Sequence, residues 1–207
     1  MTSPTPRIYA IADATTLGSE RLVEGVRTMA STGIEWIQLR MKDLADDELV
    51  GRSEACCRAV EGTEARLWID DRPDLAALLP FRGVHLGQSD LPPTAARKVV
   101  GAGVALGLST HDSDQTVRAQ EDPDVDVVAC GPVFPTRSKA GAHDAIGLEG
   151  VTRARRETVK PLVAIGGIDV DSVAAVLAAG ADSVAMIGAI CRGDIEHNCR
   201  RLLRAAA

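Results

Sequence analysis

The sequence has few aromatic residues. Phenylalanine, tryptophan and tyrosine together make up 2% of the 207 residues, whereas 45% are hydrophobic and 25% are charged. Proteins that bind single-stranded nucleic acid depend on aromatic side chains that stack on the bases. The scarcity of these side chains therefore argues against base recognition, although the overall composition is that of a globular protein.

The sequence also lacks an excess of basic residues. It contains 23 lysines and arginines against 29 aspartates and glutamates, which gives a formal net charge of -6 at pH 7. Proteins that bind a phosphate backbone need clustered basic surface. We therefore expect small-molecule substrates rather than nucleic acid as partners, and any bound anion should lie in a local pocket. A homo-oligomer is compatible with this composition.

Cysteine pairs and long apolar runs are missing as well. The chain has five cysteines with no Cys-x-x-Cys spacing: Cys56, Cys57, Cys130, Cys191 and Cys199. An odd, unpaired set argues against a disulfide framework or a zinc site and is typical of a reducing cytosol. No apolar run approaches the length of a membrane span, and no hydrophobic signal core follows the N-terminal "MTSPTPR". We therefore expect a cytoplasmic protein that does not enter a membrane.

The sequence does contain a regular alternation of short apolar runs and amphipathic segments. The apolar runs span residues 7–13, 36–40, 65–71, 83–87, 104–109, 125–133, 161–168 and 183–190. Several are apolar on both faces, as buried parallel strands are. Among the segments between them, Ser19 is placed to cap a helix that ends near Gly33, and Asp171 to open one that ends near Gly180.

Eight strand-then-helix units without a composition break predict one α/β domain over residues 1–207. Eight parallel strands that are each followed by a helix close most naturally into a (β/α)8 TIM barrel. A doubly wound open sheet is the alternative. The sequence has no Gly-x-Gly-x-x-Gly fingerprint after the first strand, however, so the barrel is favoured.

Polar residues gather where the predicted strands end, whereas the strand bodies are apolar. They are Gln38, Arg40 and Lys42 after the second strand, Asp70, Asp71 and Arg72 after the third, Asp90 after the fourth, Ser109 and His111 after the fifth, and the stretch "GPVFPTRSKAG" over 131–141 after the sixth. The carboxyl ends of barrel strands form the catalytic face of this fold. This asymmetry therefore predicts an active site.

The residue types at this face predict two anion sites. Mg²⁺ prefers one or two carboxylates together with substrate phosphate oxygens, so Asp71 and Asp90 near several cations indicate a metal-bridged diphosphate. The strand ends "AIGGI" and "MIGAI" expose backbone N–H groups suited to a phosphate monoester. Each feature also has an ordinary alternative. The aspartates could cap helices, the glycines could form only a tight turn, and the basic residues could be solvated loop charges. We assign His85 a structural role and His111 a local hydrogen bond.

Eight motifs, in this order, resemble the thiamine phosphate synthase family over nearly the whole chain. They are "IQLRMKD", "IDDRPDLA", "GVHLGQSDLP", "GLSTHD", "GPVFPTRSKAG", "GLEGV", "VAIGGI" and "GADSVAMIGAI". The resemblance implies a TIM-barrel transferase that joins hydroxymethylpyrimidine diphosphate to hydroxyethylthiazole phosphate. It further implies release of pyrophosphate with Mg²⁺ as cofactor, through a pyrimidine carbocation.

The resemblance also implies roles for individual residues. The pyrimidine diphosphate would be bound by Gln38, Arg40, Lys42, Asp70, Ser109 and Lys139, of which Arg40, Lys42 and Lys139 would act in catalysis. The thiazole phosphate would be bound by Thr136, Arg137, Ser138, Gly167, Ile187 and Gly188. Mg²⁺ would be bound by Asp71 and Asp90.

Three residues depart from the family pattern: Asp70 stands where the family usually has Asn, Met41 where it has an acidic residue, and Gly188 where it has Ser. A carboxylate repels a diphosphate unless it is metal-bound or paired. We therefore expect Asp70 at the rim, close to Mg²⁺ or paired with Arg40 or Lys42. Two alternative functions stay open: a thiazole tautomerase-like paralogue that would use His111, and a non-catalytic phosphate-binding regulator in which Asp70 is the lesion.

Overall fold

The protein is a closed barrel of eight parallel strands, paired in chain order from β1 to β8. The computed structural model describes residues 5–42, 44–136 and 144–207. The strands are β1 Ile8–Asp13, β2 Trp36–Arg40, β3 Arg66–Asp70, β4 Gly83–Leu86, β5 Ala105–Thr110, β6 Val127–Cys130, β7 Leu162–Ile165 and β8 Ser183–Met186. The predicted TIM barrel is confirmed, and the open-sheet alternative is wrong.

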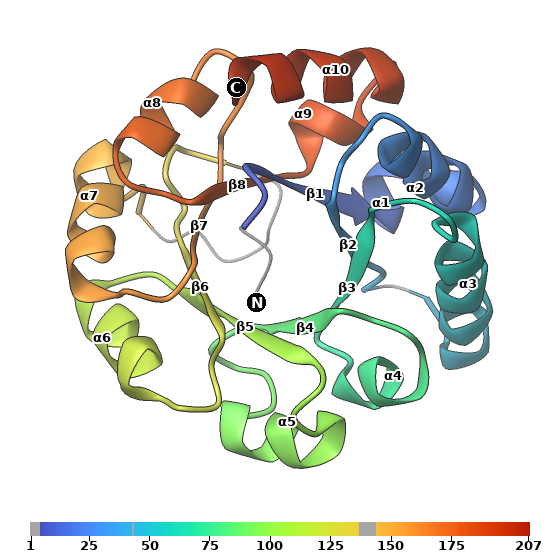
Figure 1. Ribbon diagram of the computed structural model, residues 1–207, viewed down its shortest axis with the longest axis horizontal. Helices are drawn as coiled ribbons and strands as arrows, with labels where there is room; N and C mark the ends of the chain where they lie inside the picture. Colours follow the sequence, from blue (N-terminus) through green and yellow to red (C-terminus); the bar gives the residue numbers. More distant parts are fainter. Residues whose placement is uncertain (1–4, 43, 137–143) are drawn as a thin grey trace.

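The helices surround the strands as an outer ring, and the view down the barrel in Figure 1 shows both rings. They are α1 Ala14–Leu17, the 3-10 turn η1 Ser19–Arg21, α2 Leu22–Ser31, α3 Asp46–Ala59, α4 Pro73–Leu78, α5 Pro93–Val100, α6 Ser113–Glu121, α7 Gly147–Glu157, α8 Val173–Ala178, α9 Gly188–Cys191 and α10 Ile195–Ala205. Among the described residues, none of these helices combines the length and the apolarity that a membrane crossing requires.

Some predicted boundaries are wrong for physical reasons. The eighth strand ends at Met186 rather than at residue 190, because the apolar run continues into α9 from Gly188. A short apolar run does not distinguish a strand from a buried helix. The sixth strand ends at Cys130 rather than at residue 133, and Pro132 beyond it has no N–H group to donate to a ladder.

The predicted helix starts are also displaced. Ser19 is the first residue of η1, and α2 begins at Leu22 with no side-chain cap. Likewise α8 begins at Val173, two residues beyond Asp171. The predicted ends are confirmed, because Gly33 and Gly180 have positive φ angles of 95° and 113°. Glycine adopts this conformation more readily than any other residue where a helix stops.

An aromatic cluster of Tyr9, Trp36 and Trp68 fills the barrel on the side of β1, β2 and β3. The ring centroids of the two tryptophans are 4.9 Å apart, and Tyr9 lies 5.4 Å from Trp36 and 5.6 Å from Trp68. A Cβ atom at Gly83 on β4 would lie 2.4 Å from the Trp68 ring, so only glycine admits this side chain. Because side chains alternate along a strand, the cluster lies on the same sheet face as the polar residues two or four positions later.

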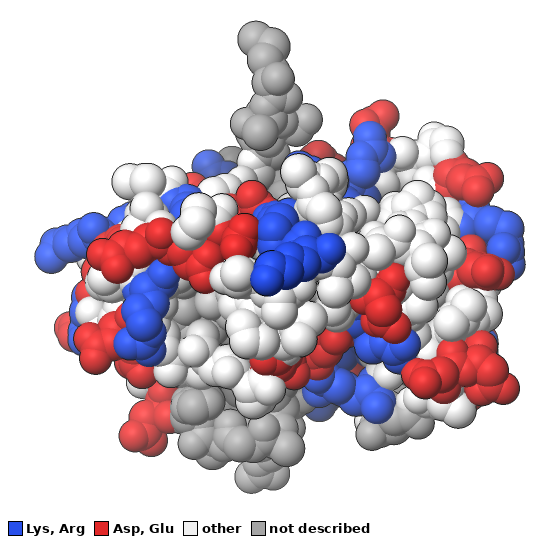
Figure 2. Space-filling view, turned by 90° about the horizontal axis from the view of Figure 1, so that it is seen from below, with Lys and Arg blue, Asp and Glu red and all other residues white. Residues whose placement is uncertain are grey.

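Surface charges of both signs are mixed. On the face of the molecule seen in Figure 2, lysine and arginine side chains alternate with aspartate and glutamate side chains over the part of the chain that is described. Many form local pairs, such as Arg72 with Asp46 and Asp74 at 2.7 and 2.6 Å, and Arg155 with Asp182 at 2.8 Å. The described part of this face has no continuous basic surface of the kind that nucleic-acid binding proteins use.

Candidate active site at the carboxyl ends of the strands

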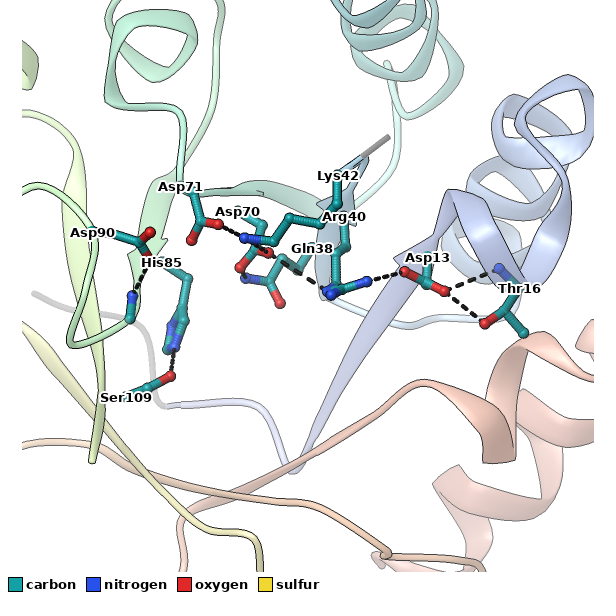
Figure 3. Close-up of polar contacts among 11 residues, drawn as sticks. Asp13, Thr16, Gln38, Arg40, Lys42, Asp70, Asp71, His85, Asp90 and Ser109 are labelled. Atoms are coloured by element: carbon teal, nitrogen blue, oxygen red, sulfur yellow. Dashed lines mark hydrogen bonds and ion pairs between the residues drawn. The ribbon is translucent and has the colours of Figure 1, made fainter. Parts of the chain in front are cut away.

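An ion-pair cluster, largely buried except for Lys42, connects the carboxyl ends of β1, β2 and β3 (Figure 3). Arg40 pairs in register with Asp13, and its Nη1 donates to Asp13 Oδ1 at 2.7 Å. On its other side Arg40 Nε lies 3.7 Å from Asp70 Oδ2. Gln38 Nε2 donates to Asp70 Oδ1 at 3.1 Å, and Lys42 Nζ lies 3.5 Å from Asp70 Oδ2. The charge of Asp70 is therefore compensated by two cations, and its predicted pairing is confirmed.

Asp71 turns the chain out of β3. Its φ angle is 60°, and its backbone N–H donates to the His85 carbonyl at 2.9 Å. In an uninterrupted strand Asp70 and Asp71 would face opposite sides of the sheet. The left-handed turn brings Asp71 to the same rim as Asp70, and its carboxylate forms an ion pair with Lys42. Lys42 therefore forms ion pairs with both carboxylates.

Asp90 lies beyond β4, the strand next to β3 in the barrel. Its Oδ2 accepts a hydrogen bond from the Gly87 backbone N–H at 2.7 Å. A Cβ atom at Gly87 would lie 2.8 Å from that oxygen, so the missing side chain leaves room for the carboxylate. Asp71 and Asp90 thus belong to the ends of adjacent strands.

The donor set of these loops fits Mg²⁺. The described residues contain no group of three or more His, Cys, Asp or Glu side chains that could hold a metal without further ligands. Mg²⁺ does not need such a cage, because it is commonly bound by one or two carboxylates that leave places for phosphate oxygens and water. Asp71 and Asp90 offer that number of carboxylates.

His85 supports Ser109 from below the rim. His85 Nε2 lies 2.9 Å from Ser109 Oγ, and both residues are buried. Gly107 admits the ring, because a Cβ atom there would lie 2.5 Å from His85 Nδ1. The Ser109 carbonyl accepts from Gln88 Nε2 at 2.7 Å. The structural role of His85 stays a prediction, and its contact with Ser109 is compatible with it.

A cavity of about 680 Å³ opens at the carboxyl ends of β5 to β8. Its lining contains Ser109, Thr136, Gly167, Ile187 and Gly188, all predicted as site residues. The structure therefore divides the described site residues into two groups, because Gln38, Arg40, Lys42, Asp70, Asp71 and Asp90 do not line this cavity. The predicted residues Arg137, Ser138 and Lys139 lie outside the described residues.

The wall of the cavity at β7 is a glycine turn. Gly166 and Gly167 have positive φ angles of 102° and 67°. Cβ atoms there would lie 2.5 Å from Pro132 Cβ and 2.7 Å from Phe134 Cβ, so the turn packs directly on the loop after β6. Within the described chain, neither the Gly167 nor the Gly188 backbone N–H donates a hydrogen bond. These two groups are available to an anion in the cavity.

His111, whose Nδ1 lies 2.7 Å from the Gly131 carbonyl, makes the local contact predicted for it.

Two charged residues of the rim were not predicted from the sequence. Asp13 ends β1 and contacts Arg40, and its other carboxylate oxygen accepts from the Thr16 N–H at 3.0 Å. An acidic residue at the end of the first apolar run is the signal that could have identified it. Arg192 lines the cavity one helical turn beyond Gly188. Its position in a connecting loop carries no pattern that the sequence alone would single out.

Comparison with known proteins identifies the family. Residues 8–190 match the model of the thiamine monophosphate synthase family. The chain belongs to this family. A thiamine-phosphate synthase of Koribacter versatilis is 40% identical over 186 residues, covering 88% of this chain and 87% of that protein. A thiamine-phosphate synthase of Moorella thermoacetica is 39% identical over 197 residues, covering 94% and 93%.

The fold comparison agrees with the thiamine monophosphate synthase assignment. The solved structure of a thiamine phosphate pyrophosphorylase from Pyrococcus furiosus is similar with a TM-score of 0.86 and 29% identity, covering 97% of this chain and 95% of that one. Relatives named as synthases make this a family of transferases. Neither the tautomerase-like nor the non-catalytic alternative is favoured.

Proposed function

We propose that the protein joins hydroxymethylpyrimidine diphosphate to hydroxyethylthiazole phosphate and releases pyrophosphate, with Mg²⁺ as its cofactor. One observation carries the proposal: a single barrel face holds both a cation and carboxylate cluster around Asp70 and a separate cavity with free backbone N–H groups. The first suits a metal-bound diphosphate and the second suits a monophosphate.

The diphosphate is held by the cations of the cluster. Arg40 uses Nη1 on Asp13, but its buried Nε has no hydrogen-bond partner within the described chain. A buried donor without a partner is costly, and a phosphate oxygen would satisfy it. Lys42 is 42% exposed and can turn from the carboxylates toward the diphosphate. Gln38 adds a neutral donor at the end of β2. Ser109, which also lines the cavity, adds one at the end of β5.

Asp71 and Asp90 would hold Mg²⁺, which when bound offsets the negative charge that grows on a departing diphosphate. Lys42, which forms an ion pair with Asp71, would have to give up this contact when the carboxylate binds the metal. Asp70 stays paired with Arg40 and keeps this cation at the rim when Lys42 turns toward the diphosphate.

The chemistry is substitution at the pyrimidine methylene carbon. The C–O bond to the diphosphate breaks and its electron pair leaves with the pyrophosphate, while Arg40 and Lys42 stabilise the charge that develops there. The aminopyrimidine shares the positive charge left on the methylene. The lone pair of the thiazole nitrogen then forms the new C–N bond. No protein nucleophile is required, so the chain acts by positioning the substrates and stabilising charge.

The thiazole phosphate occupies the cavity at β5 to β8. The N–H groups of Gly167, Ile187 and Gly188 and the hydroxyl group of Thr136 are its proposed ligands. The corresponding roles of Arg137 and Ser138, and that of Lys139 in diphosphate departure, fall on residues outside the described chain and stay predictions from the sequence.

Pyrophosphate release tests the proposed function. With both substrates and Mg²⁺, we expect stoichiometric pyrophosphate and thiamine phosphate, and we expect EDTA to stop the reaction. Absence of pyrophosphate release with both substrates and the metal would overturn the proposal. Pyrophosphate release that does not require the thiazole phosphate would indicate a diphosphate hydrolase instead.

A further inference from the structure

The cavity contains one strong cation that the proposed reaction has not yet used. Among the described residues that line the cavity, Arg192 is the only lysine or arginine, and Asp169 is the only carboxylate. Asp169 Oδ1 accepts from the Ser172 N–H at 3.1 Å and from its hydroxyl at 2.9 Å, so it is engaged at the start of α8. Arg192 is exposed, and none of the ion pairs found within the described chain includes it. Its charge is therefore available to an anion in the cavity.

Gly188 leaves room for this guanidinium. Its φ angle is not positive, so the backbone does not require glycine there. A Cβ atom at Gly188 would meet only Arg192, with Cζ and Nε both at 3.6 Å and Nη1 at 3.8 Å, which is ordinary contact. Nothing in the fold therefore forbids a serine, the residue that the family resemblance implies at this position. The Arg192 guanidinium lies over the position that a residue 188 side chain would occupy.

We propose that Arg192 binds the phosphate group of the thiazole substrate and takes the place of the hydroxyl group that Gly188 lacks. The proposal rests on the proposed function, because it assumes that this phosphate enters the cavity. A guanidinium offers several N–H donors in a planar fork that matches a phosphate, whereas a serine offers one hydroxyl donor. With the Arg192 guanidinium in place of a serine hydroxyl group, binding of the phosphate at this position would depend on an ionic interaction.

The first experiment replaces Arg192 and measures both substrates. For Arg192→Met we expect KM for the thiazole phosphate to rise about 10-fold, because a charge-assisted contact is lost. KM for the pyrimidine diphosphate and kcat should stay within about twofold, because Arg192 lines the cavity and Arg40, Lys42 and Asp70 do not. Arg192→Lys should keep part of the affinity, and high salt should weaken binding to wild type more than to Arg192→Met. Arg201→Met, an exposed arginine on α10 without an ion pair in the described chain, is the matched control.

The second experiment tests the exchange with Gly188 directly. Gly188→Ser introduced into the Arg192→Met protein should recover part of the lost affinity for the thiazole phosphate, because the hydroxyl group returns to the cavity. An unchanged KM for the thiazole phosphate in Arg192→Met would overturn the proposal. So would an equal rise in the KM of both substrates, because that would indicate a general structural effect.

A binding measurement separates this proposal from the proposed function. Thiazole phosphate is titrated calorimetrically into each variant in the presence of Mg²⁺ and pyrophosphate, where no coupling can occur. If wild type binds thiazole phosphate but the enzyme assay shows no pyrophosphate release, the proposed reaction is wrong. The role of Arg192 is then tested by the dissociation constants of wild type and the Arg192 variants alone. If wild type does not bind the thiazole phosphate, both proposals fail.

Discussion

At the scale of single residues, Asp71 is the most constrained position of the rim. It is the one non-glycine residue of the described chain with a positive φ angle, 60°. Asparagine and aspartate tolerate this conformation better than other side chains. An Asp71→Asn exchange therefore removes the charge without adding backbone strain, whereas Asp71→Ala would combine both effects.

We predict that Asp71→Asn and Asp90→Asn each raise the Mg²⁺ concentration needed for half-maximal rate by about 10-fold or more, because each removes a hard anionic ligand. The measurement is pyrophosphate release across a magnesium titration. Asp114→Asn, an exposed aspartate on α6, is the control and should behave as wild type. If both rim variants keep the wild-type rate at limiting Mg²⁺, these carboxylates are not ligands.

Asp70→Asn should leave an active enzyme with altered magnesium dependence. The asparagine oxygen can still accept from Gln38 Nε2, while Arg40 and Lys42 lose a competing anion. We expect KM for the pyrimidine diphosphate to fall by about threefold, since Lys42 is partly exposed and its interactions are screened. Steady-state kinetics at several Mg²⁺ concentrations measure this. The opposite result, an inactive wild type that Asp70→Asn makes active, would mean that Asp70 disables the site.

Sequence reasoning identified most of the rim residues because strand ends in a barrel converge, so a polar residue after an apolar run is a site candidate. It identified Asp70 as a paired anion because Arg40 and Lys42 follow the neighbouring strand. It could not identify Arg192, because only the folded loop brings a cation back over Gly188. Asp13 was missed because its carboxylate also interacts with α1 and resembles an ordinary helix cap.

At the scale of elements, the turn after β7 depends on two glycines that pack on the loop after β6. We predict that Gly167→Ala lowers the free energy of unfolding by about 1–2 kcal/mol, because an alanine at φ 67° is strained and its Cβ would lie 2.8 Å from the Phe134 carbonyl oxygen. KM for the thiazole phosphate should rise in the same variant. Thermal melting and steady-state kinetics measure the two effects.

Gly103→Ala is the matched control for this turn. Gly103 has no atom within 4 Å of a built Cβ and no positive φ angle, so alanine should be neutral or slightly stabilising there. Equal melting temperatures for Gly167→Ala and wild type would show that the turn tolerates a side chain and does not constrain the cavity.

The order and type of the strands could be predicted because each apolar run is short and separated by an amphipathic segment. Their ends could not all be predicted. Residues 187–190 are as apolar as the strand before them, and the change from β8 to α9 at Gly188 depends on tertiary packing rather than on composition. The 3-10 turn at Ser19 could not be predicted either, because serine is common both at helix N-caps and in turns.

At the scale of the whole molecule, the buried thiols predict how stability depends on pH. Burial raises the pKa of Cys56, Cys130 and Cys191 to about 12 and that of Cys57 to about 11, and burial and the nearby Asp70 raise the pKa of Tyr9. Since the folded protein holds these protons more tightly than the unfolded chain, stability is complete below the thiol pKa of the unfolded chain, near 9, and is lost as pH rises toward 12.

Melting temperatures between pH 8 and pH 11 measure this loss, which should become steeper above about pH 9. Cys56→Ala should show a smaller decrease over the same range, because one of the buried thiols is gone. Native protein should also react slowly with thiol reagents, and all five cysteines should react once it is unfolded. A native thiol that titrates near pH 9, or identical pH profiles for the two proteins, would contradict the prediction.

The aromatic cluster makes intrinsic tryptophan fluorescence a probe of the charged rim. Both of its tryptophans, Trp36 and Trp68, lie in this cluster, with ring planes tilted by 49° at 4.9 Å. Trp68 precedes Asp70 by two residues and Trp36 precedes Arg40 by four, so each ring lies one or two steps down the strand from the charged rim. All intrinsic tryptophan emission therefore originates beside the cations that would receive a diphosphate. A ligand that separates Arg40 from Asp70 would change the electric field at the indoles and shift their emission without any attached dye.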